Sequence, residues 1–256
     1  MCTLAIYFRA DAEYPLIVAA NRDELYARPT IAPAWLARDP WVIGGKDLRA
    51  SGTWLGVNGH NLVGGLLNRR AKEAPDPTRR SRGLLCLEAL RQSTPDAVLA
   101  QLGDYDARAF NSFNLLVASP DAAFVFSNAA GTIELTRLDP GLHLLTNLAL
   151  NDVTCPRIAK SHSMFEAALT VLQREGIDAF RATLRTVLSD HSTPLDPRSQ
   201  DMPNNLCVHG EQYGTRSSSI LAYSAKDERF RMWYADGAPC RTPHVEIALP
   251  APESRS

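Results

Sequence analysis

The chain has 256 residues, of which 45% are hydrophobic and 21% charged, and its formal net charge is −1. This composition is typical of a globular protein, and the small net charge excludes a global electrostatic attraction to nucleic acid or to a membrane surface. No run of the sequence approaches the roughly 18 apolar residues that a membrane-spanning helix needs. We therefore expect a cytoplasmic protein without a membrane span.

The first 70 residues are predicted to form a series of β-strands. Apolar runs over residues 2–8 and 15–21 flank a polar segment and have the lengths typical of a hairpin. Short apolar runs with glycine or Asn-Gly between them continue over 41–45, 52–57 and 61–68. The prolines at 29, 33 and 40 favour a long connection after the second strand.

A pair of helices comes next, followed by a second block of strands. Leu84, Leu87 and Leu90 have helical spacing, and Thr94-Pro95-Asp96 is typical of a helix N-terminus. Turn residues separate the apolar runs over 113–119, 122–128, 132–138 and 141–147, which we predict to be strands.

Two more helices and a closing pair of strands end the pattern. The helix beginning at Pro156 is expected to bury Ile158, His162, Phe165, Leu169 and Leu172. The next is expected to bury Ile177, Phe180, Leu184 and Leu188. The closing strands cover 216–224 and 229–235, and the segment 190–214 has no clear element. A loop of that length is usually functional or disordered.

This order of elements predicts an α+β fold. Consecutive strands joined by tight turns indicate antiparallel sheets, and helices in separate blocks indicate outer layers. We expect a four-layer αββα sandwich in one domain over residues 1–249, with 250–256 as a disordered tail.

The cysteines indicate neither a disulfide framework nor a metal site. Five cysteines are an odd number and widely spaced, which favours a reducing compartment. Cys207 and His209 could supply two ligands, but zinc needs four, and no spacing indicates the others. The familiar nucleotide-binding patterns are also missing from the sequence. We therefore predict no metal and no resident cofactor.

Cys2 is a candidate nucleophile because of its position. Aminopeptidases remove an initiator methionine that precedes a small residue, and the new α-amine of Cys2 would have a pKa of about 7.7–8.0. One residue would then supply both a nucleophile and a base. The alternative is that Cys2 is a small apolar residue at the start of a buried strand.

Four polar residues at the end of the second predicted strand favour the catalytic interpretation. In a hairpin this end lies beside the start of the first strand, so residues 21–24 should lie near Cys2. A carboxylate there can orient an ammonium group, and an arginine favours a thiolate. The alternative is a polar turn, which explains one or two such residues more easily than four.

Several separated motifs resemble those of the NRDE family, the family of transport and Golgi organisation protein 2. They are the initial Met-Cys, NRDE at 21–24, and the segments 44–57, 66–70, 81–83, 144–147 and 213–219. That family in turn resembles the N-terminal-nucleophile hydrolases of the choloylglycine hydrolase and penicillin V acylase group. Those enzymes have an αββα sandwich and cleave amides with a processed cysteine.

The resemblance implies roles for individual residues. Asp23 would anchor the amine of Cys2, Asn68 would serve the oxyanion hole, and Asn147 and Arg216 would complete the catalytic set. The arginine of the hydrolase motif has no counterpart, because Ala20 stands in its place. Strand-end turn positions are the alternative for the two asparagines.

We therefore expect a hydrolase of small-molecule amide or related acyl bonds. Asn21, Arg22 and Arg69 are the candidate substrate-binding residues, and the arginines suggest an anionic group on the ligand. The resemblance leaves a second hypothesis open, a non-catalytic carrier of haem or lipid. Nucleic-acid binding through the basic segment 69–82 is the weakest interpretation, and we expect no nucleic-acid partner.

Overall fold

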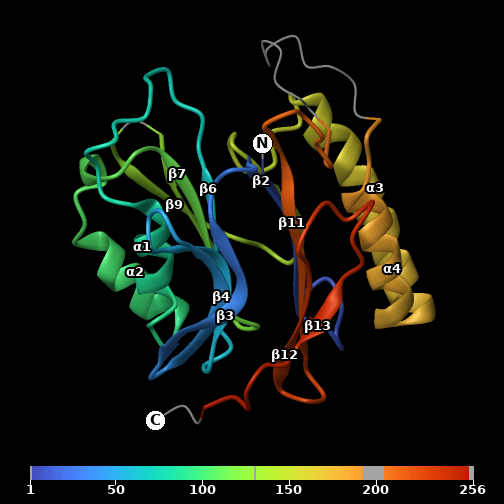
Figure 1. Ribbon diagram of the computed structural model, residues 1–256. Helices are drawn as coiled ribbons and strands as arrows, with labels where there is room; N and C mark the ends of the chain where they lie inside the picture. The colour runs from blue at the N-terminus through green and yellow to red at the C-terminus, as the bar shows by residue number, and fades with distance from the viewer. Residues whose placement is uncertain (1, 130, 193–204, 254–256) are drawn as a thin grey trace. The chain divides into compact units, whose positions relative to one another are not determined.

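The computed structural model describes residues 2–129, 131–192 and 205–253 (Figure 1). The chain divides into two compact units. Unit 1 comprises Met1–Ala27, Pro140–Ala222 and Arg231–Ile247, and unit 2 comprises Arg28–Asp139, Tyr223–Phe230 and Ala248–Ser256. Much of the predicted loop 190–214, namely 193–204, lies outside the described residues.

Unit 1 is built on a six-stranded sheet with the order β10-β1-β2-β11-β12-β13. The strands are β1 (Thr3–Phe8), β2 (Leu16–Leu25), β10 (Gly141–Leu145), β11 (Tyr213–Ser224), β12 (Arg229–Ala235) and β13 (Val245–Ile247). The predicted hairpin of β1 and β2 is confirmed, with Thr3 opposite Asn21. The NRDE residues continue β2 and do not form a turn after it.

Helices α3 (Pro156–Glu175) and α4 (Ile177–Leu188) run side by side along one face of this sheet (Figure 1). Both predicted helices are confirmed, but the buried face of α3 differs from the expected one. Ser161 and Ala168 are buried, whereas His162 and Leu169 lie at the margin. Small residues therefore let α3 approach the sheet, and the core beneath it includes Tyr7, whose hydroxyl donates to the carbonyl of Phe165 at 2.7 Å.

Unit 2 is built on a seven-stranded sheet in chain order, β3 to β9. The strands are β3 (Thr30–Arg38), β4 (Trp41–Asp47), β5 (Thr53–Asn58), β6 (Val63–Asn68), β7 (Phe113–Ala118), β8 (Ala123–Asn128) and β9 (Ile133–Arg137). Strand β3 occupies the stretch expected to be a long connection. It tolerates Pro33 because it is an edge strand and its pairing with β4 shifts between Ile31 and Ala34.

Helices α1 (Arg82–Ala89) and α2 (Pro95–Gly103) contact the sheet of unit 2, and a 3-10 turn (Ala107–Ala109) follows them. Thr94 caps α2 as predicted, accepting from the Ala97 amide at 3.1 Å. In α1 the buried side chains are Leu85, Cys86 and Ala89, whereas Leu84 and Leu87 are only partly buried. The glycines of β5 and β6 explain this, since a Cβ at Gly64 would press on Cys86 and Leu90.

The C-terminal residues pack on unit 2. The Glu253 carboxylate accepts from the Trp41 amide at 3.0 Å, and the Trp41 indole donates to the Ala251 carbonyl at 2.9 Å. Ala251 and Glu253 of the expected disordered tail have these contacts, and 254–256 lie outside the described residues. Among the described helices, none combines the length and apolarity needed to span a membrane.

Candidate active site

Cys2 lies at the start of β1, with its thiol against the backbone of Asp23. The Asp23 amide donates to Cys2 Sγ at 3.4 Å, and the thiol donates to the Asp23 carbonyl at 3.5 Å. Burial, followed by the negative charge of Asp23, raises the pKa of the Cys2 thiol. The sulfur is therefore protonated at neutral pH, and a nucleophilic role for it requires a nearby base.

The carboxylate of Asp23 is withdrawn from solvent, with 0% of its side chain exposed. Its Oδ1 accepts from the hydroxyl of Thr215 at 2.7 Å, and its Oδ2 lies 3.9 Å from the Arg157 guanidinium. A buried carboxylate needs such partners because desolvation penalises its charge. The predicted proximity of Cys2 and Asp23 is therefore present in unit 1, while the catalytic role of Asp23 stays a prediction.

Arg157 is a site residue that sequence reasoning missed. It follows Pro156 in the first turn of α3, is 1% exposed, and also donates to the hydroxyl of Thr3. Among the described residues, its Nε and Nη1 have no hydrogen-bond partner. Burial lowers the pKa of Arg157, with the charge of Asp23 opposing the shift. No signal marked this arginine, because arginine supplies all but four of the 27 basic residues.

Strand pairing relates two other predicted residues to Cys2. Leu145, the last residue of β10, pairs with Leu4, so Asn147 follows two residues after the end of the strand beside β1. On the other side, Thr3 pairs with Asn21, so the next step brings Arg22 opposite Cys2. Because side chains alternate along a strand, Cys2 and Arg22 share one face of the sheet and Asp23 the other.

Arg216 of β11 lies on the same face as Arg22. The Thr215 hydroxyl binds Asp23, and the Ser218 hydroxyl donates to the Ala20 carbonyl at 3.3 Å, so the start of β11 runs beside the end of β2. Alternation then directs Arg216 away from the face that Thr215 shares with Asp23. Arg216 is half-buried, and among the described residues its Nε lacks a hydrogen-bond partner.

Asn21 and Tyr213 complete the polar surroundings of Asp23. Asn21 is buried, and its amide donates to the carbonyls of Leu188 and Leu206, both at 2.8 Å, which ties the end of α4 to β2. The Tyr213 hydroxyl donates to the Asp23 carbonyl at 3.2 Å, and burial raises the pKa of Tyr213. These contacts give Asn21 a structural task, and substrate binding by it stays a prediction.

Asn68 and Arg69, the remaining predicted residues, belong to unit 2. Asn68 is an exposed residue at the end of β6, opposite Phe113 of β7. Arg69 donates through Nη1 to the Asn114 side chain at 3.3 Å, and Ser127 donates to the same oxygen at 2.8 Å. The roles of Asn68 and Arg69 remain predictions.

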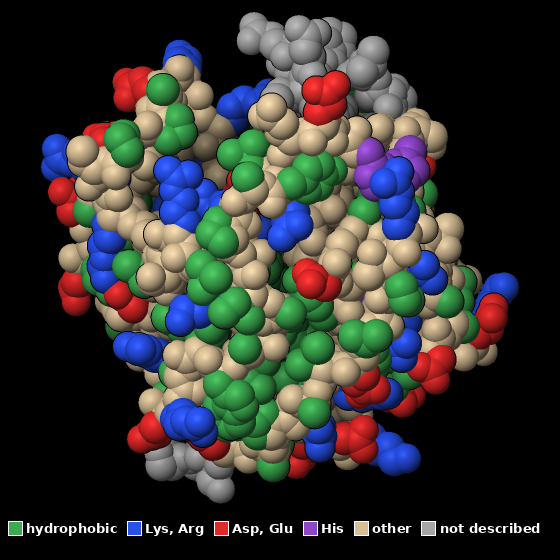
Figure 2. Space-filling view, viewed as in Figure 1, with side chains coloured by type: hydrophobic (Ala, Val, Ile, Leu, Met, Phe, Trp, Pro, Cys, Tyr) green, Lys and Arg blue, Asp and Glu red, His purple; other side chains and the backbone are tan. Residues whose placement is uncertain are grey.

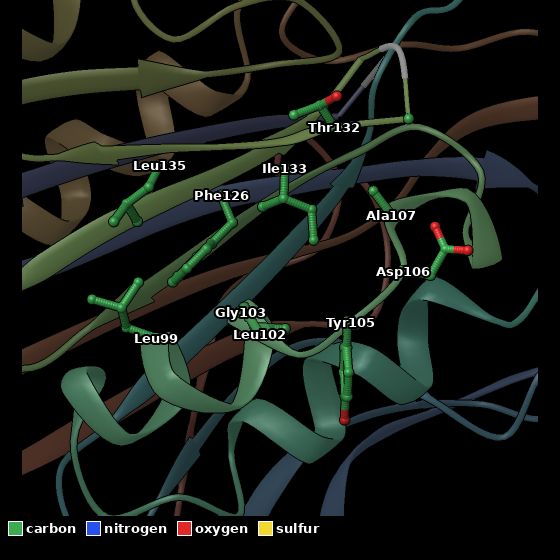
Figure 3. A pocket seen from close by; sticks show the side chains of 11 residues that line it. Leu99, Leu102, Gly103, Tyr105, Asp106, Ala107, Phe126, Thr132, Ile133 and Leu135 are labelled. Carbon is green, nitrogen blue, oxygen red and sulfur yellow. The ribbon is translucent and has the colours of Figure 1, made fainter.

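Unit 2 contains a pocket of about 350 Å³ that involves none of the predicted site residues (Figure 3). It lies between α2, the 3-10 turn and β8–β9, with apolar walls formed by Leu99, Leu102, Phe126, Ile133 and Leu135. The Tyr105 hydroxyl at its edge already donates to Glu88 at 2.9 Å. This lining suits a small apolar molecule and includes no cysteine, serine or lysine among its described side chains.

Comparison with known proteins identifies relatives over most of the chain. The family model described as Transport and Golgi organisation 2 matches residues 1–233. The Transport and Golgi organization 2 homolog of Mus musculus is 26% identical over 246 residues, covering 86% of this chain and 88% of that protein. Transport and Golgi organization protein 2 of Drosophila melanogaster is 26% identical over 259 residues and covers 89% of each.

Solved structures with a similar fold are N-terminal-nucleophile hydrolases. Penicillin V acylase from Agrobacterium tumefaciens has a TM-score of 0.60 at 12% identity, covering 92% of this chain and 83% of that one. A mutant conjugated bile acid hydrolase from Clostridium perfringens has a TM-score of 0.57 at 11% identity, covering 96% and 92%. The α+β fold of two antiparallel sheets with helices, expected of an N-terminal-nucleophile hydrolase, is thereby confirmed.

Proposed function

Because the chain belongs to the Transport and Golgi organisation 2 family and has the N-terminal-nucleophile hydrolase fold, we propose that it hydrolyses small-molecule amide or related acyl bonds through Cys2. The observation that carries this proposal is the placement of the Cys2 thiol against Asp23, 3.4 Å from its amide nitrogen.

The base in this proposal is the α-amine of Cys2, released when Met1 is removed. A free amine with a pKa of about 7.7–8.0 is partly neutral at pH 7 and lies within reach of its own thiol. The buried thiol has a raised pKa, so proton transfer to the amine is needed to form the thiolate. The Asp23 carboxylate, fixed by Thr215 and Arg157, orients the resulting ammonium group.

The reaction proceeds through a thioester. Cys2 Sγ attacks the carbonyl carbon while its proton moves to the α-amine, and the ammonium then protonates the leaving nitrogen as the C–N bond breaks. Water, deprotonated by the same amine, hydrolyses the thioester and regenerates the thiol. Asn147 of unit 1 is the proposed amide donor to the oxyanion, since preorganised donors stabilise the charge that develops there.

Arg22 and Arg216 indicate that the proposed substrate carries a negative charge. Both lie on the face of unit 1 that carries Cys2, and Arg22 is only 8% exposed and 3.7 Å from Glu24. Guanidinium groups in such partly desolvated positions bind carboxylates and phosphates well. We therefore propose an acyl compound with an anionic group as the substrate class.

Covalent labelling tests the proposal. An electrophilic β-lactone should acylate the chain once, at residue 2, and intact mass should show that Met1 is gone. Cys2→Ala should abolish labelling and Asp23→Asn should slow it, whereas Cys86→Ala, a change of a fully buried cysteine in unit 2, should leave it unchanged. Labelling that persists in Cys2→Ala would contradict the proposal.

The pocket in unit 2 supports a second candidate function, carriage of a small apolar ligand such as a lipid. Its described lining contains no histidine, cysteine or methionine, so the usual protein ligands of haem iron are limited there to Tyr105. Displacement of a fluorescent fatty acid tests this function. Ile133→Trp, which fills the pocket, should abolish binding, and Ile31→Trp on exposed β3 should not.

A further inference from the structure

Unit 1 contains a cluster of soft metal ligands that the catalytic proposal does not use. Two imidazoles and two thiols from distant parts of the sequence each offer one ligand atom, and these four atoms lie within 4.8 Å of one another. We propose that this cluster is a structural zinc site whose ligands are His191, Cys207, His209 and Cys240.

The distances within the cluster fit a tetrahedral ion. Cys207 Sγ lies 3.7 Å from Cys240 Sγ and 3.7 Å from His209 Nε2, and His209 Nε2 lies 3.2 Å from Cys240 Sγ. A tetrahedral Zn²⁺ with Zn–S of about 2.3 Å and Zn–N of about 2.0–2.1 Å separates its sulfurs by about 3.8 Å and sulfur from nitrogen by about 3.6 Å. The atoms are therefore nearly in place.

The fourth ligand, His191, has the hydrogen bond typical of a metal-bound imidazole. Its Nδ1 lies 2.9 Å from the carbonyl oxygen of Cys207. When Nδ1 carries the proton and donates to this oxygen, Nε2 keeps its lone pair for the metal, an arrangement that orients most histidine ligands. The rings of His191 and His209 are 5.0 Å apart, so both can turn to one ion.

The charge balance also favours zinc. Two thiolates and two neutral imidazoles neutralise Zn²⁺, and binding releases the two thiol protons.

Local backbone contacts hold the ligands together. The Cys207 amide donates to the Asp190 carbonyl at 3.1 Å, which joins the segment that follows α4 to the segment beginning at Asn205. Arg185 of α4 donates to the Pro239 carbonyl at 2.9 Å and so fixes the turn that carries Cys240. Histidine side chains gather in one group on the surface in Figure 2. His191 and His209 are themselves exposed, so an ion can enter from solvent.

The proposed site is coupled to the surroundings of Asp23. The residues on either side of Cys207 both bind site residues, Leu206 through its carbonyl to Asn21 and Val208 through its amide to Thr215 at 2.9 Å. Thr215 in turn donates to Asp23. A zinc ion that fixes Cys207 would therefore also fix the polar groups that hold Asp23 in place.

Sequence reasoning predicted no metal because it compared only neighbouring residues. Cys207 and His209 form a recognisable pair, but His191 and Cys240 lie on opposite sides of them in the chain. The fold brings all four together, and the inference is independent of the proposed hydrolase activity. A Cys207–Cys240 disulfide is the competing use of the two sulfurs.

Metal titration of the reduced, chelator-stripped chain tests the site. Native mass spectrometry should show one Zn²⁺ gained and two protons lost, and Co²⁺ should give the intense visible absorption of tetrahedral thiolate coordination. His191→Ala and Cys240→Ser should weaken affinity by more than the roughly 10–100-fold that loss of an outer hydrogen-bond partner costs.

Matched controls are available for both residue types. His162→Ala changes a half-buried histidine of α3, and Cys155→Ser keeps an N-cap that favours serine, so both should bind zinc like the unchanged chain. If Cys240→Ser fails to fold, His191→Ala still tests zinc binding, because His191 is exposed. Metal uptake unaffected by either ligand variant, no stoichiometric uptake by the reduced chain, or a Cys207–Cys240 disulfide in its place would overturn the proposal.

Discussion

The guanidinium of Arg157 lies 3.9 Å from the carboxylate of Asp23, with 1% and 0% of the two side chains exposed. This ion pair joins the first turn of α3 to the end of β2 on the face opposite the Cys2 thiol. It supplies a positive charge beside Asp23 from a part of the chain that no local motif marks.

Breaking this ion pair should destabilise unit 1. Arg157→Met leaves the buried Asp23 charge without its partner, and we expect the free energy of unfolding to fall by about 3–5 kcal/mol. Chemical denaturation measures the loss. The double variant with Asp23→Asn should lose less than the single one, because both charges are then removed. A double variant as unstable as the sum of the two single changes would contradict this coupling.

The hydroxyl of Thr215 is expected to stabilise the ionised Asp23. It donates to Asp23 at 2.7 Å and accepts from the Val208 amide at 2.9 Å. Thr215→Val removes both bonds at nearly constant volume and should cost about 1.5–3 kcal/mol of unfolding free energy. Thr183→Val in α4, whose hydroxyl only donates within its own helix, is the control and should cost much less. Equal losses of unfolding free energy in the two variants would contradict the expected stabilisation of Asp23 by Thr215.

Acidification should weaken the fold through His244. Burial, with the charges of Arg185 and Arg181, lowers the pKa of His244 to about 4. Its neutral form is thus favoured in the fold, so the stabilisation is complete above the unfolded pKa of about 6.5 and is lost as the pH falls toward 4.

The loss can reach about 3 kcal/mol, at about 1.4 kcal/mol per pKa unit. Since Asp47 and Asp190 also lose stabilisation in acid, the measurement is a difference between variants. His244→Gln should flatten the decline of unfolding free energy between pH 6.5 and 4.5. An unchanged slope would show that His244 does not contribute.

The start of α1 should tolerate no side chain at Gly52. A Cβ there would collide with the backbone of Gly83, whereas a Cβ at Gly103, the last residue of α2, meets nothing within 4 Å. Gly52→Ala should therefore lower the free energy of unfolding by about 1–3 kcal/mol or more. Gly103→Ala should raise it by about 0.4–1 kcal/mol. Thermal melting of the two variants compares them directly. We expect the melting temperature to fall in Gly52→Ala and to rise in Gly103→Ala. An unchanged melting temperature in both variants would contradict the close packing of Gly52 against Gly83.

Local patterns predicted the elements well where one physical rule dominated. The β1–β2 hairpin follows from alternating and apolar runs, and the Thr94 cap follows from its side-chain oxygen. Strand β3 was missed because proline signals a loop, yet at a sheet edge its missing N–H costs little. Glycines of the sheet that are distant in sequence set how closely α1 packs, which the leucine spacing alone does not predict.

The candidate site shows the same division. The proximity of Cys2 to Asp23 follows from strand pairing, which is local. Arg157 reaches Asp23 only because α3 packs across the sheet, and the four possible metal ligands meet only through tertiary structure. Such contacts produce no regular spacing in the sequence, so they cannot be predicted from a single sequence.

The free α-amine of Cys2 is the central claim, and one variant isolates it. A lysine inserted between Met1 and Cys2 blocks methionine removal while leaving the thiol and β1 in place, which the melting temperature can verify. Amine release from N-acyl compounds with an anionic group, followed side by side in both chains, should occur in the Met1-free chain and vanish in the inserted one. Equal turnover by the two chains would contradict the account, because the thiol would then act without its own amine.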